Sequence, residues 1–589
     1  MGARARVLIG LVTSGAAILA FLPGTAARAA SHLPVMHDPG LAVEEVVSGL
    51  TAPVNMAFIG EGDILVNEKV TGRVQRVVDG VVVGTVLDLA VNFGSERGLL
   101  GIALHPEFPS DPGVYLYWTE SSTGVDTNVL SQTPLLGNRV DRYEWNGSAL
   151  VFDHNIIRIR AIQQDAGQPE RGNHDGGVLA FGPDGNLYIF IGDLGRRGWL
   201  QNLACGPTTE CPGPLVPDDQ FGGPEPDDAH LSGVILRLND DGTIPADNPF
   251  FAAGAAIGGE VGANIQRLFS YGHRNGFGID FHPVTGDLWM QENGDDTFSE
   301  INRVEPGMNG GWIQIAGPVE RIEQFKALET TFGAMALQQL RWPPTNIADS
   351  PGEALARLFM LPGAHYQDPE LAWKWEIAPG GIGFAGPALG PAYENDLFQG
   401  AATPVLRGGY LFRLDTSSGN LVVSDPRLAD GVADNLAKHD ITESESLLVG
   451  SNFGVVTDID TGPDGALYLV SITKGAIYRI SATGITVDID PVVPTDGSRG
   501  QVSGTITCDA GDFYLVELSL TQGDAAATGR QRGRCTGEPQ EVRMGFATTG
   551  PAFSGGTASA CMALHTAAPG SRTATDHPEL CRPVTVAVR

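Results

Sequence analysis

Short apolar segments alternate with turns rich in Gly, Pro and Asp along most of the chain. Within a segment, apolar and polar residues follow a period near two, and a turn separates it from the next, which is the pattern of a β-hairpin. The clearest copies are residues 56–66, 102–118, 179–190, 279–290 and 459–470. Because one hairpin cannot bury both of its faces, this irregular repetition predicts a β-propeller in preference to a β-sandwich or two stacked barrels.

The length of the repetitive region sets the number of blades. At roughly 40–50 residues per four-stranded blade, residues 41–480 have room for six blades and long insertions. Residues 194–230 and 318–372 are the expected insertions. Within the second, residues 319–329 and 352–359 have the apolar spacing of short amphipathic helices. Such insertions usually cover one face of a propeller.

The pattern changes after residue 480. Residues 483–500 are acidic and contain proline, which indicates a linker. Residues 501–589 return to alternating strands and predict a small, disulfide-tied, β-sandwich-like domain with no evident catalytic constellation. The chain is therefore expected to be all-β, with a six-bladed propeller and its loop insertions over residues 31–482.

The first 30 residues have the layout of a secretory signal peptide. Arg4 and Arg6 precede an apolar run over residues 7–22, and small residues stand before a plausible cleavage site at Ala30. A membrane anchor is the alternative, but Gly, Thr and Ser interrupt the run. No later stretch reaches the ~18 apolar residues of a spanning helix, so we expect no membrane insertion after the signal is removed.

The cysteines and the charge agree with export. Cys205 and Cys211 flank one loop and the other four cysteines lie near the C-terminus, so one local and two C-terminal disulfides are expected. A secreted or periplasmic location follows. The formal net charge of −32 argues against nucleic acid as a partner. An anionic ligand would have to be held by local cations or by a metal.

Two polar stretches carry the candidate chemistry. The first is the glycine-rich corner at residues 171–177, where His174 precedes a hairpin that ends at Asp193. A neutral imidazole beside an orienting carboxylate is a suitable general base, although a lone turn histidine is the plainer interpretation. The second pairs Arg274 with the loop at 291–302, one hairpin later. This loop holds the oxygen supply that calcium prefers, although Asx turns would also explain it: Glu292, Asn293, Asp295, Asp296 and Glu300.

Five segments resemble, in their sequence and in their order along the chain, the soluble glucose/sorbosone dehydrogenases that depend on pyrroloquinoline quinone (PQQ). The segments are residues 95–108, 173–193, 233–249, 271–275 and 300–312. The resemblance implies a six-bladed propeller with PQQ and calcium on its axis. It also implies oxidation of a sugar or alcohol hydroxyl, with electrons passed on to a soluble acceptor.

The resemblance also implies roles for single residues. His174 corresponds to the general base and Asp193 to its orienting carboxylate. Arg274 corresponds to the cation beside the quinone oxygen. The residues expected to contact the cofactor with it are Asn275, Asn293 and Arg407, the last facing its carboxylates.

The remaining roles concern the substrate and the metal. Glu96 corresponds to a residue that faces the sugar. The backbone carbonyls of Gly294 and Asp295 correspond to the calcium ligands, and Glu300 is expected to contribute to the metal site.

One departure from the family pattern lies in the last blade. Residues 451–458 carry no cation where the family typically places arginines against the cofactor's carboxylates. A non-catalytic propeller that binds a glycan or a protein, as in hedgehog-interacting protein, is therefore an alternative. A calcium-dependent lactonase is a third and less favoured one.

Overall fold

The computed structural model describes residues 33–162, 172–195, 231–332, 345, 347–404, 408–571, 573–577 and 579–588. The expected signal peptide and most of the insertion at 194–230 lie outside these residues. Cys205, Cys211 and Arg407 lie outside them as well.

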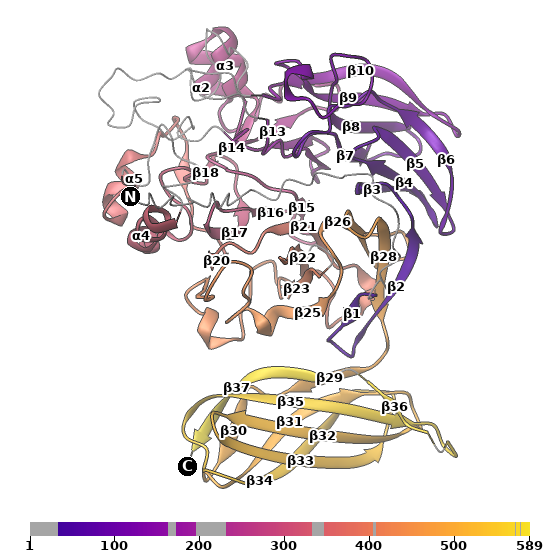
Figure 1. Ribbon diagram of the computed structural model, residues 1–589, viewed down its shortest axis with the longest axis vertical. Helices are drawn as coiled ribbons and strands as arrows, with labels where there is room; N and C mark the ends of the chain where they lie inside the picture. The colour runs from indigo at the N-terminus through magenta and orange to yellow at the C-terminus, as the bar shows by residue number, and fades with distance from the viewer. Residues whose placement is uncertain are drawn as a thin grey trace, which may run out of the picture.

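The N-terminal part consists of mainly antiparallel sheets arranged around a common centre (Figure 1). Its first sheet contains β3 (Pro53–Gly60), β4 (Asp63–Glu68), β5 (Arg73–Val78) and β6 (Val81–Asp88). The second contains β7 (Leu99–Leu104), β8 (Gly113–Thr119), β9 (Asn138–Trp145) and β10 (Leu150–Ile159). The third contains β11 (Val178–Phe181), β12 (Leu187–Ile191), β13 (Val234–Leu238) and β14 (Leu268–Tyr271), extended by β18 (Met308–Asn309) and β19 (His365–Tyr366).

Two further sheets continue the series. One contains β15 (Ile279–Phe281), β16 (Leu288–Glu292), β17 (Thr297–Val304), β20 (Leu371–Trp375) and β24 (Val432–Ala433). The next contains β21 (Pro379–Phe384), β22 (Leu397–Ala401), β23 (Tyr410–Leu414) and β25 (Leu448–Ser451), with β1 (Val35–Met36) on its outer edge.

The last sheet of the ring is assembled from both ends of this part of the chain. Strands β26 (Val456–Thr461), β27 (Leu467–Ser471) and β28 (Ala476–Ala482) are completed by β2 (Leu41–Ser48). The propeller-like arrangement is thus confirmed, but the prediction of six blades needs correction. Five sheets are blades whose four main strands follow one another in chain order, whereas this sheet is composite. Local periodicity could not show that its fourth strand comes from the N-terminus.

The first strand of every sheet faces the centre. A cavity of about 440 Å³ is lined by residues of β3, β7, β11, β15, β21 and β26 together. The hairpins predicted from the sequence are all present, as β3–β4, β7–β8, β11–β12, β15–β16 and β26–β27. The loops that enter and leave these inner strands therefore meet near the axis, where a site can form.

Helices are few, and they lie outside the blades (Figure 1). The described α-helices are α2 (Phe251–Ile257), α3 (Gly259–Gln266), α4 (Ile322–Phe332) and α5 (Pro351–Arg357). The helices predicted at 319–329 and 352–359 are confirmed, the first with a 3₁₀ turn, Val319–Arg321, before α4. No helix in the described part of the chain is long and apolar enough to cross a membrane.

The C-terminal part is a closed barrel and not the predicted sandwich. Its strands are β29 (Thr486–Ile489), β30 (Val492–Thr495), β31 (Arg499–Thr507), β32 (Phe513–Gln522), β33 (Ala525–Arg534), β34 (Gln540–Thr548), β35 (Gly556–Ala567), β36 (Thr575–Asp576) and β37 (Leu580–Val588). Pairing of β31 with β34 joins the two edges of the sheet, so the seven strands β30–β35 and β37 form a ring. The predicted linker at 483–500 is also wrong, because it contains β29 and β30.

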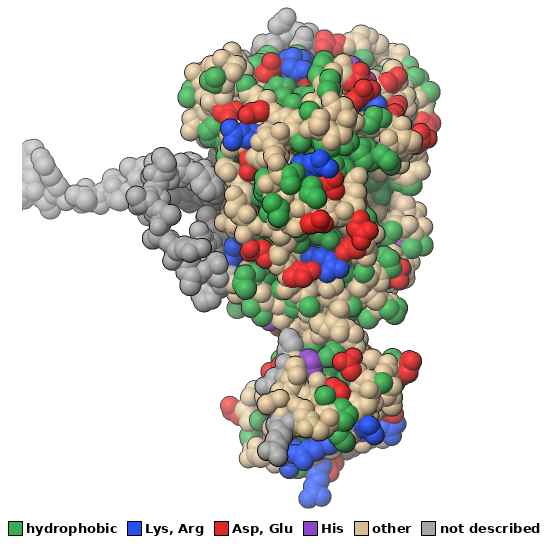
Figure 2. Space-filling view, turned by 90° about the vertical axis from the view of Figure 1, so that its right-hand side faces the viewer, with side chains coloured by type: hydrophobic (Ala, Val, Ile, Leu, Met, Phe, Trp, Pro, Cys, Tyr) green, Lys and Arg blue, Asp and Glu red, His purple; other side chains and the backbone are tan. Residues whose placement is uncertain are grey.

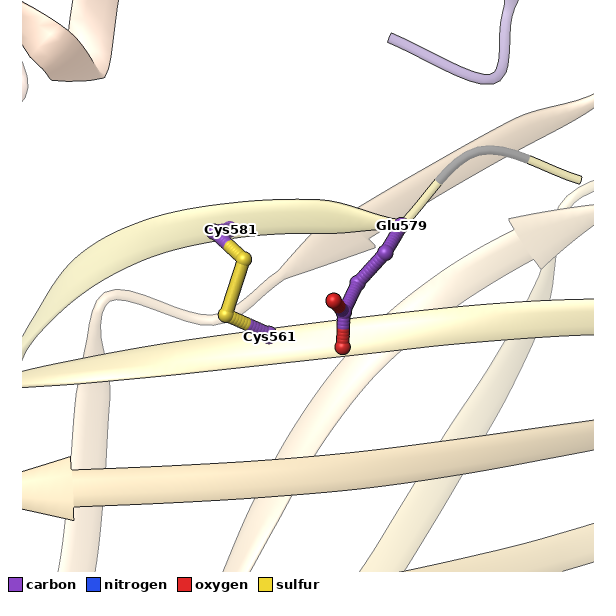
Figure 3. Close-up of side chains that lie close together, drawn as sticks. All are labelled: Cys561, Glu579 and Cys581. Carbon is purple, nitrogen blue, oxygen red and sulfur yellow. A yellow bond between two sulfur atoms is a disulfide. The ribbon is translucent and has the colours of Figure 1, made fainter. Parts of the chain in front are cut away.

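The barrel has a hydrophobic core of its own, made only of residues from 485 onward. Disulfides join Cys508 to Cys535 and Cys561 to Cys581, so the two predicted C-terminal bridges are confirmed. Glu579 lies beside the second bridge (Figure 3), but both sulfurs are bonded to each other and are not free to hold a metal. Basic side chains gather at the far end of the barrel on the face shown in Figure 2.

The bridge Cys508–Cys535 gives a testable prediction about the barrel. Replacing both cysteines by Ser should lower the free energy of unfolding of the barrel by about 3 kcal/mol, because the bridge restricts the unfolded chain over 27 residues. All 8 tryptophans precede residue 376, so their fluorescence reports only the propeller. In a urea titration, the circular-dichroism transition of the barrel should move to lower urea while the fluorescence midpoint stays fixed. Equal shifts of both midpoints would show that the barrel does not unfold separately.

Candidate active site

His174 and Asp193 meet because β11 and β12 pair antiparallel. Val178 lies opposite Phe190, so the residues before β11 and after β12 emerge at the same edge of the sheet. The corner before β11 is tight: His174 has φ of 58°, and a Cβ on Gly176 would lie 2.8 Å from the carbonyl oxygen of Phe190. This geometry brings Nδ1 of His174 within 2.6 Å of Oδ1 of Asp193.

Asp193 is buried and held by several donors. Its Oδ1 also accepts from the backbone N–H of Gly195 at 2.8 Å, and its Oδ2 accepts from the indole N–H of Trp312 at 3.0 Å. Burial alone would raise the pKa of Asp193, but the neighbouring His174, the charge of Arg274 and the Trp312 hydrogen bond outweigh it and hold this pKa below its usual value. Asp193 is therefore ionised at neutral pH.

An ionised carboxylate can only accept, so it fixes the state of the imidazole. Nδ1 of His174 must carry the proton that it donates to Asp193, which leaves Nε2 of the neutral ring as an acceptor. No described residue hydrogen-bonds to Nε2. The pair thus has the arrangement of a general base whose tautomer and orientation are set from behind.

Glu96 connects the histidine corner to the next polar loop. Its Oε2 accepts from the backbone N–H of His174 at 2.7 Å and from Nδ2 of Asn275 at 3.1 Å. The carboxylate therefore lies between the first and second of the stretches that the sequence analysis singled out.

Arg274 is buried within a set of acceptors. Its Nη1 donates to the carbonyl oxygen of Asn293 at 2.9 Å and its Nη2 to Oδ1 of Asp295 at 3.1 Å. The guanidinium also lies over the ring of Trp312, 5.5 Å from its centroid. Burial would lower the pKa of Arg274, but Asp295 and Asp193 outweigh that effect and raise it, so the charge is permanent.

Two acidic residues of the 291–302 loop do not take part in a shared oxygen cluster. Glu292 accepts from the backbone N–H of Arg274 at 2.7 Å and pairs with the ring of His273, so it braces the arginine. Glu300 accepts from Asn302 at 3.1 Å and from the backbone N–H of Gly317 at 2.5 Å. Burial and the nearby Glu292 raise the pKa of Glu300 to about 8.

A cavity of about 230 Å³ opens beside these residues on the axis. Of the predicted site residues, Glu96 and Asn293 contribute to its lining, together with Lys69. Apolar residues that include Pro379, Val456 and Ile472 form much of the remaining wall. Nζ of Lys69 donates to the carbonyl oxygens of Ser95 and Phe93, and burial lowers its pKa to about 8.

The structure thus brings together nearly all the predicted site residues that it describes. His174, Asp193, Glu96, Asn275 and Arg274 form one connected group through the contacts above, and Asn293 and Asp295 join it at Arg274. Glu300 lies apart from that group. Trp312 and Lys69 also belong to the site, although the sequence did not predict them. Trp312 ends a segment of the family resemblance, but its contact with Asp193 could not be read from its position alone.

Known proteins resemble this chain in sequence. The sequence model described as "Glucose / Sorbosone dehydrogenase" matches residues 50–350, about half of the chain. The chain belongs to the glucose/sorbosone dehydrogenase family. The resemblance inferred from the motifs is confirmed. Among the relatives of this family member, an uncharacterized protein of Synechocystis sp. is 28% identical over 458 residues, which cover 76% of this chain and 88% of that protein.

Two other relatives have named activities. Quinoprotein glucose dehydrogenase B of Acinetobacter calcoaceticus is 30% identical over 282 residues, covering 46% of this chain and 52% of that protein. Aldose sugar dehydrogenase YliI of Escherichia coli is 23% identical over 387 residues, which cover 66% of this chain and 77% of that protein. A solved structure of a putative glucose dehydrogenase from Thermus thermophilus aligns with a TM-score of 0.49 at 25% identity, over 75% of this chain and 100% of that one.

The lowered pKa of Asp193 gives a prediction about stability and pH. Asp193→Asn should cost about 2 kcal/mol of unfolding free energy at neutral pH, because hydrogen bonds to a buried charge are lost. A carboxyl group whose pKa is lower in the folded than in the unfolded protein stabilises the fold at every pH above the pKa of the unfolded chain, about 4. This contribution is lost as the pH falls from there through the pKa of the folded protein. Urea titrations from pH 7 to pH 3 should therefore show the gap between wild type and variant closing on the acid side.

An exposed ion pair serves as the control for this experiment. Asp247 is paired with Arg237 and its side chain is 75% exposed, so Asp247→Asn should cost less than about 1 kcal/mol. A gap for Asp193→Asn that stays constant down to pH 3 would contradict the assignment of a lowered pKa.

Proposed function

We propose that the protein is an exported quinoprotein oxidoreductase. It oxidises the hydroxyl of an aldose or related sugar or alcohol by hydride transfer to PQQ, with calcium assistance, and delivers the electrons to a soluble acceptor. The observation that carries the proposal is the His174–Asp193 pair, which leaves Nε2 of the imidazole as a hydrogen-bond acceptor. The backbone of His174 is held by Glu96, which lines the cavity. Family membership and the two relatives with named sugar dehydrogenase activities support it.

The residues present fit a flat, anionic cofactor. Lys69 and Asn293 contribute polar side chains to the lining of the cavity, while Pro379, Val456 and Ile472 supply apolar walls for a ring system. Oδ1 of Asn275 is buried without a hydrogen-bond partner among the described residues, as expected if it faces a ligand. Residues 451–458 carry no cation, and Lys69 is the basic residue among those that line the cavity. Arg274 and Arg407 remain proposed contacts of the cofactor.

A hard cation also has suitable neighbours here. The backbone carbonyls of Gly294 and Asp295 are the proposed calcium ligands. The ammonium of Lys438 lies 3.4 Å from the Asp295 carbonyl oxygen and pairs with the Asp296 carboxylate, which shows that this corner attracts positive charge. Glu300 is the weakest part of the proposal, because its carboxylate is engaged with Asn302 and Gly317.

The chain's own residues would act as follows. When bound, PQQ and calcium supply the hydride acceptor and its polarisation. Nε2 of His174 takes the proton of the substrate hydroxyl, and the ionised Asp193 stabilises the imidazolium that results. Arg274 places a fixed positive charge where negative charge develops on reduction, in a buried setting that strengthens the interaction. Glu96 orients the sugar hydroxyl by accepting a hydrogen bond.

A second candidate is a propeller that binds a glycan or protein without catalysis. The cation-free stretch at 451–458 favours it, as does a 28% identity over 167 residues to the hedgehog-interacting protein of Mus musculus. That protein is matched over only 22% of its length, so the dehydrogenase proposal takes precedence.

The role of His174 can be tested directly. Purified protein is titrated with PQQ in the presence of calcium and assayed for dye reduction with a panel of aldoses. His174→Ala should lower kcat by about 10²- to 10⁴-fold, the usual contribution of a general base, and leave the quinone affinity within about threefold. An unchanged kcat in this variant would refute the assignment, and absence of both quinone binding and turnover in the wild type would favour the binding protein.

The chain offers a matched control. His154 also pairs through Nδ1 with an aspartate, Asp153, at 3.0 Å, but on the surface of the second blade. His154→Ala removes the same kind of pair away from the axis and should leave kcat and quinone affinity unchanged.

A further inference from the structure

Three carboxylates converge beside the proposed active site. Asp295 and Asp296 lie in the turn between β16 and β17, and Glu329 comes from α4 in the 318–372 insertion. One oxygen from each of the three lies within 4.8 Å of the others. The group thus joins a blade of the propeller to a helix that is distant in sequence.

Part of this oxygen set is satisfied within the protein. Oε1 of Glu329 accepts from the hydroxyl of Thr297 at 2.9 Å and from the backbone N–H of Asp296 at 3.4 Å. Oδ1 of Asp296 is paired with Lys438. These contacts fix one oxygen of each carboxylate.

The second oxygens have no such contact. Oε2 of Glu329 and Oδ2 of Asp296 are buried and have no hydrogen-bond partner among the described residues. Glu329 is fully buried, and Asp296 is 7% exposed. A buried carboxylate oxygen without a partner is costly, so a fully satisfied site requires something to occupy this position.

Charge points to a cation as the occupant. Three carboxylates face two basic groups, Arg274 and Lys438, which leaves negative charge uncompensated. A bound cation would remove the cost of keeping all three carboxylates ionised.

We propose that Asp295, Asp296 and Glu329 form a binding site for a divalent, oxygen-preferring cation of the calcium class. Carboxylate oxygens are the ligands that such ions prefer, and no nitrogen or sulfur ligand belongs to the cluster. This site uses side-chain carboxylates, whereas the metal proposed for the cofactor uses the backbone carbonyls of Gly294 and Asp295. Its ion would fasten α4 to the loop whose Asp295 holds Arg274 in place.

The test measures how many calcium ions the protein binds without quinone. Full-length, calcium-depleted protein is titrated with calcium chloride by isothermal titration calorimetry. Wild type should bind one more equivalent than Glu329→Gln, or the affinity at that site should fall at least tenfold in the variant. Glu323→Gln is the matched control, because it makes the same change on an exposed position of the same helix, and it should bind as wild type does.

A second variant guards against a folding defect. Asp296→Asn should lose the same equivalent, and tryptophan fluorescence reports whether each variant is folded. Identical calcium binding by wild type, Glu329→Gln and Asp296→Asn would overturn the proposal and leave a shared proton as the occupant. Because quinone is absent throughout, failure of the dehydrogenase proposal would leave this result unaffected.

Discussion

Pairing of β2 with β28 is the constraint on which the rest of the propeller depends. The ladder runs from Leu41 opposite Ala482 to Ser48 opposite Ala476, so it joins the start of the ring to its end. The candidate site takes Glu96, His174 and Arg274 from loops of successive blades. These three residues can contact one another only if each inner strand lies at a fixed distance from the axis. A closed ring of sheets fixes that distance.

Within that ring, the site is organised by buried charge. Asp193 lies between an imidazole and a guanidinium, and Arg274 in turn lies between two aspartates. Trp312 touches both partners, donating to Asp193 and covering Arg274 with its ring. Each charge is therefore stabilised by its neighbours before any ligand arrives, which is the condition for electrostatic preorganisation.

The sequence predicted what depends on local pattern. The hairpins, the helix at 319–329 and the His174–Asp193 pair follow from periodicity or from a motif that one hairpin holds together. It did not predict what depends on distant pairing. Alternating strands are equally compatible with a sandwich and a barrel, and the choice rests on β31 meeting β34.

The same limit applies to single residues. Glu329 lies on the apolar face of its helix with Ile322 and Phe325. A glutamate at that spacing indicates a buried carboxylate, and this much could be read from the sequence. Its partners, however, come from another element. Glu292 was grouped with calcium ligands because it is acidic, whereas its position directs it to the backbone of Arg274.

The closed barrel has a consequence for the behaviour of the chain at high concentration. An open sheet ends in strands whose unpaired N–H and C=O groups can pair with another molecule. In the barrel, β31 and β34 bond to each other instead, over eight pairs from Arg499 opposite Ala547 to Ile506 opposite Gln540, so these edges are used within the chain. The module can thus add a second folded unit to the chain without providing a template for strand-by-strand association between molecules.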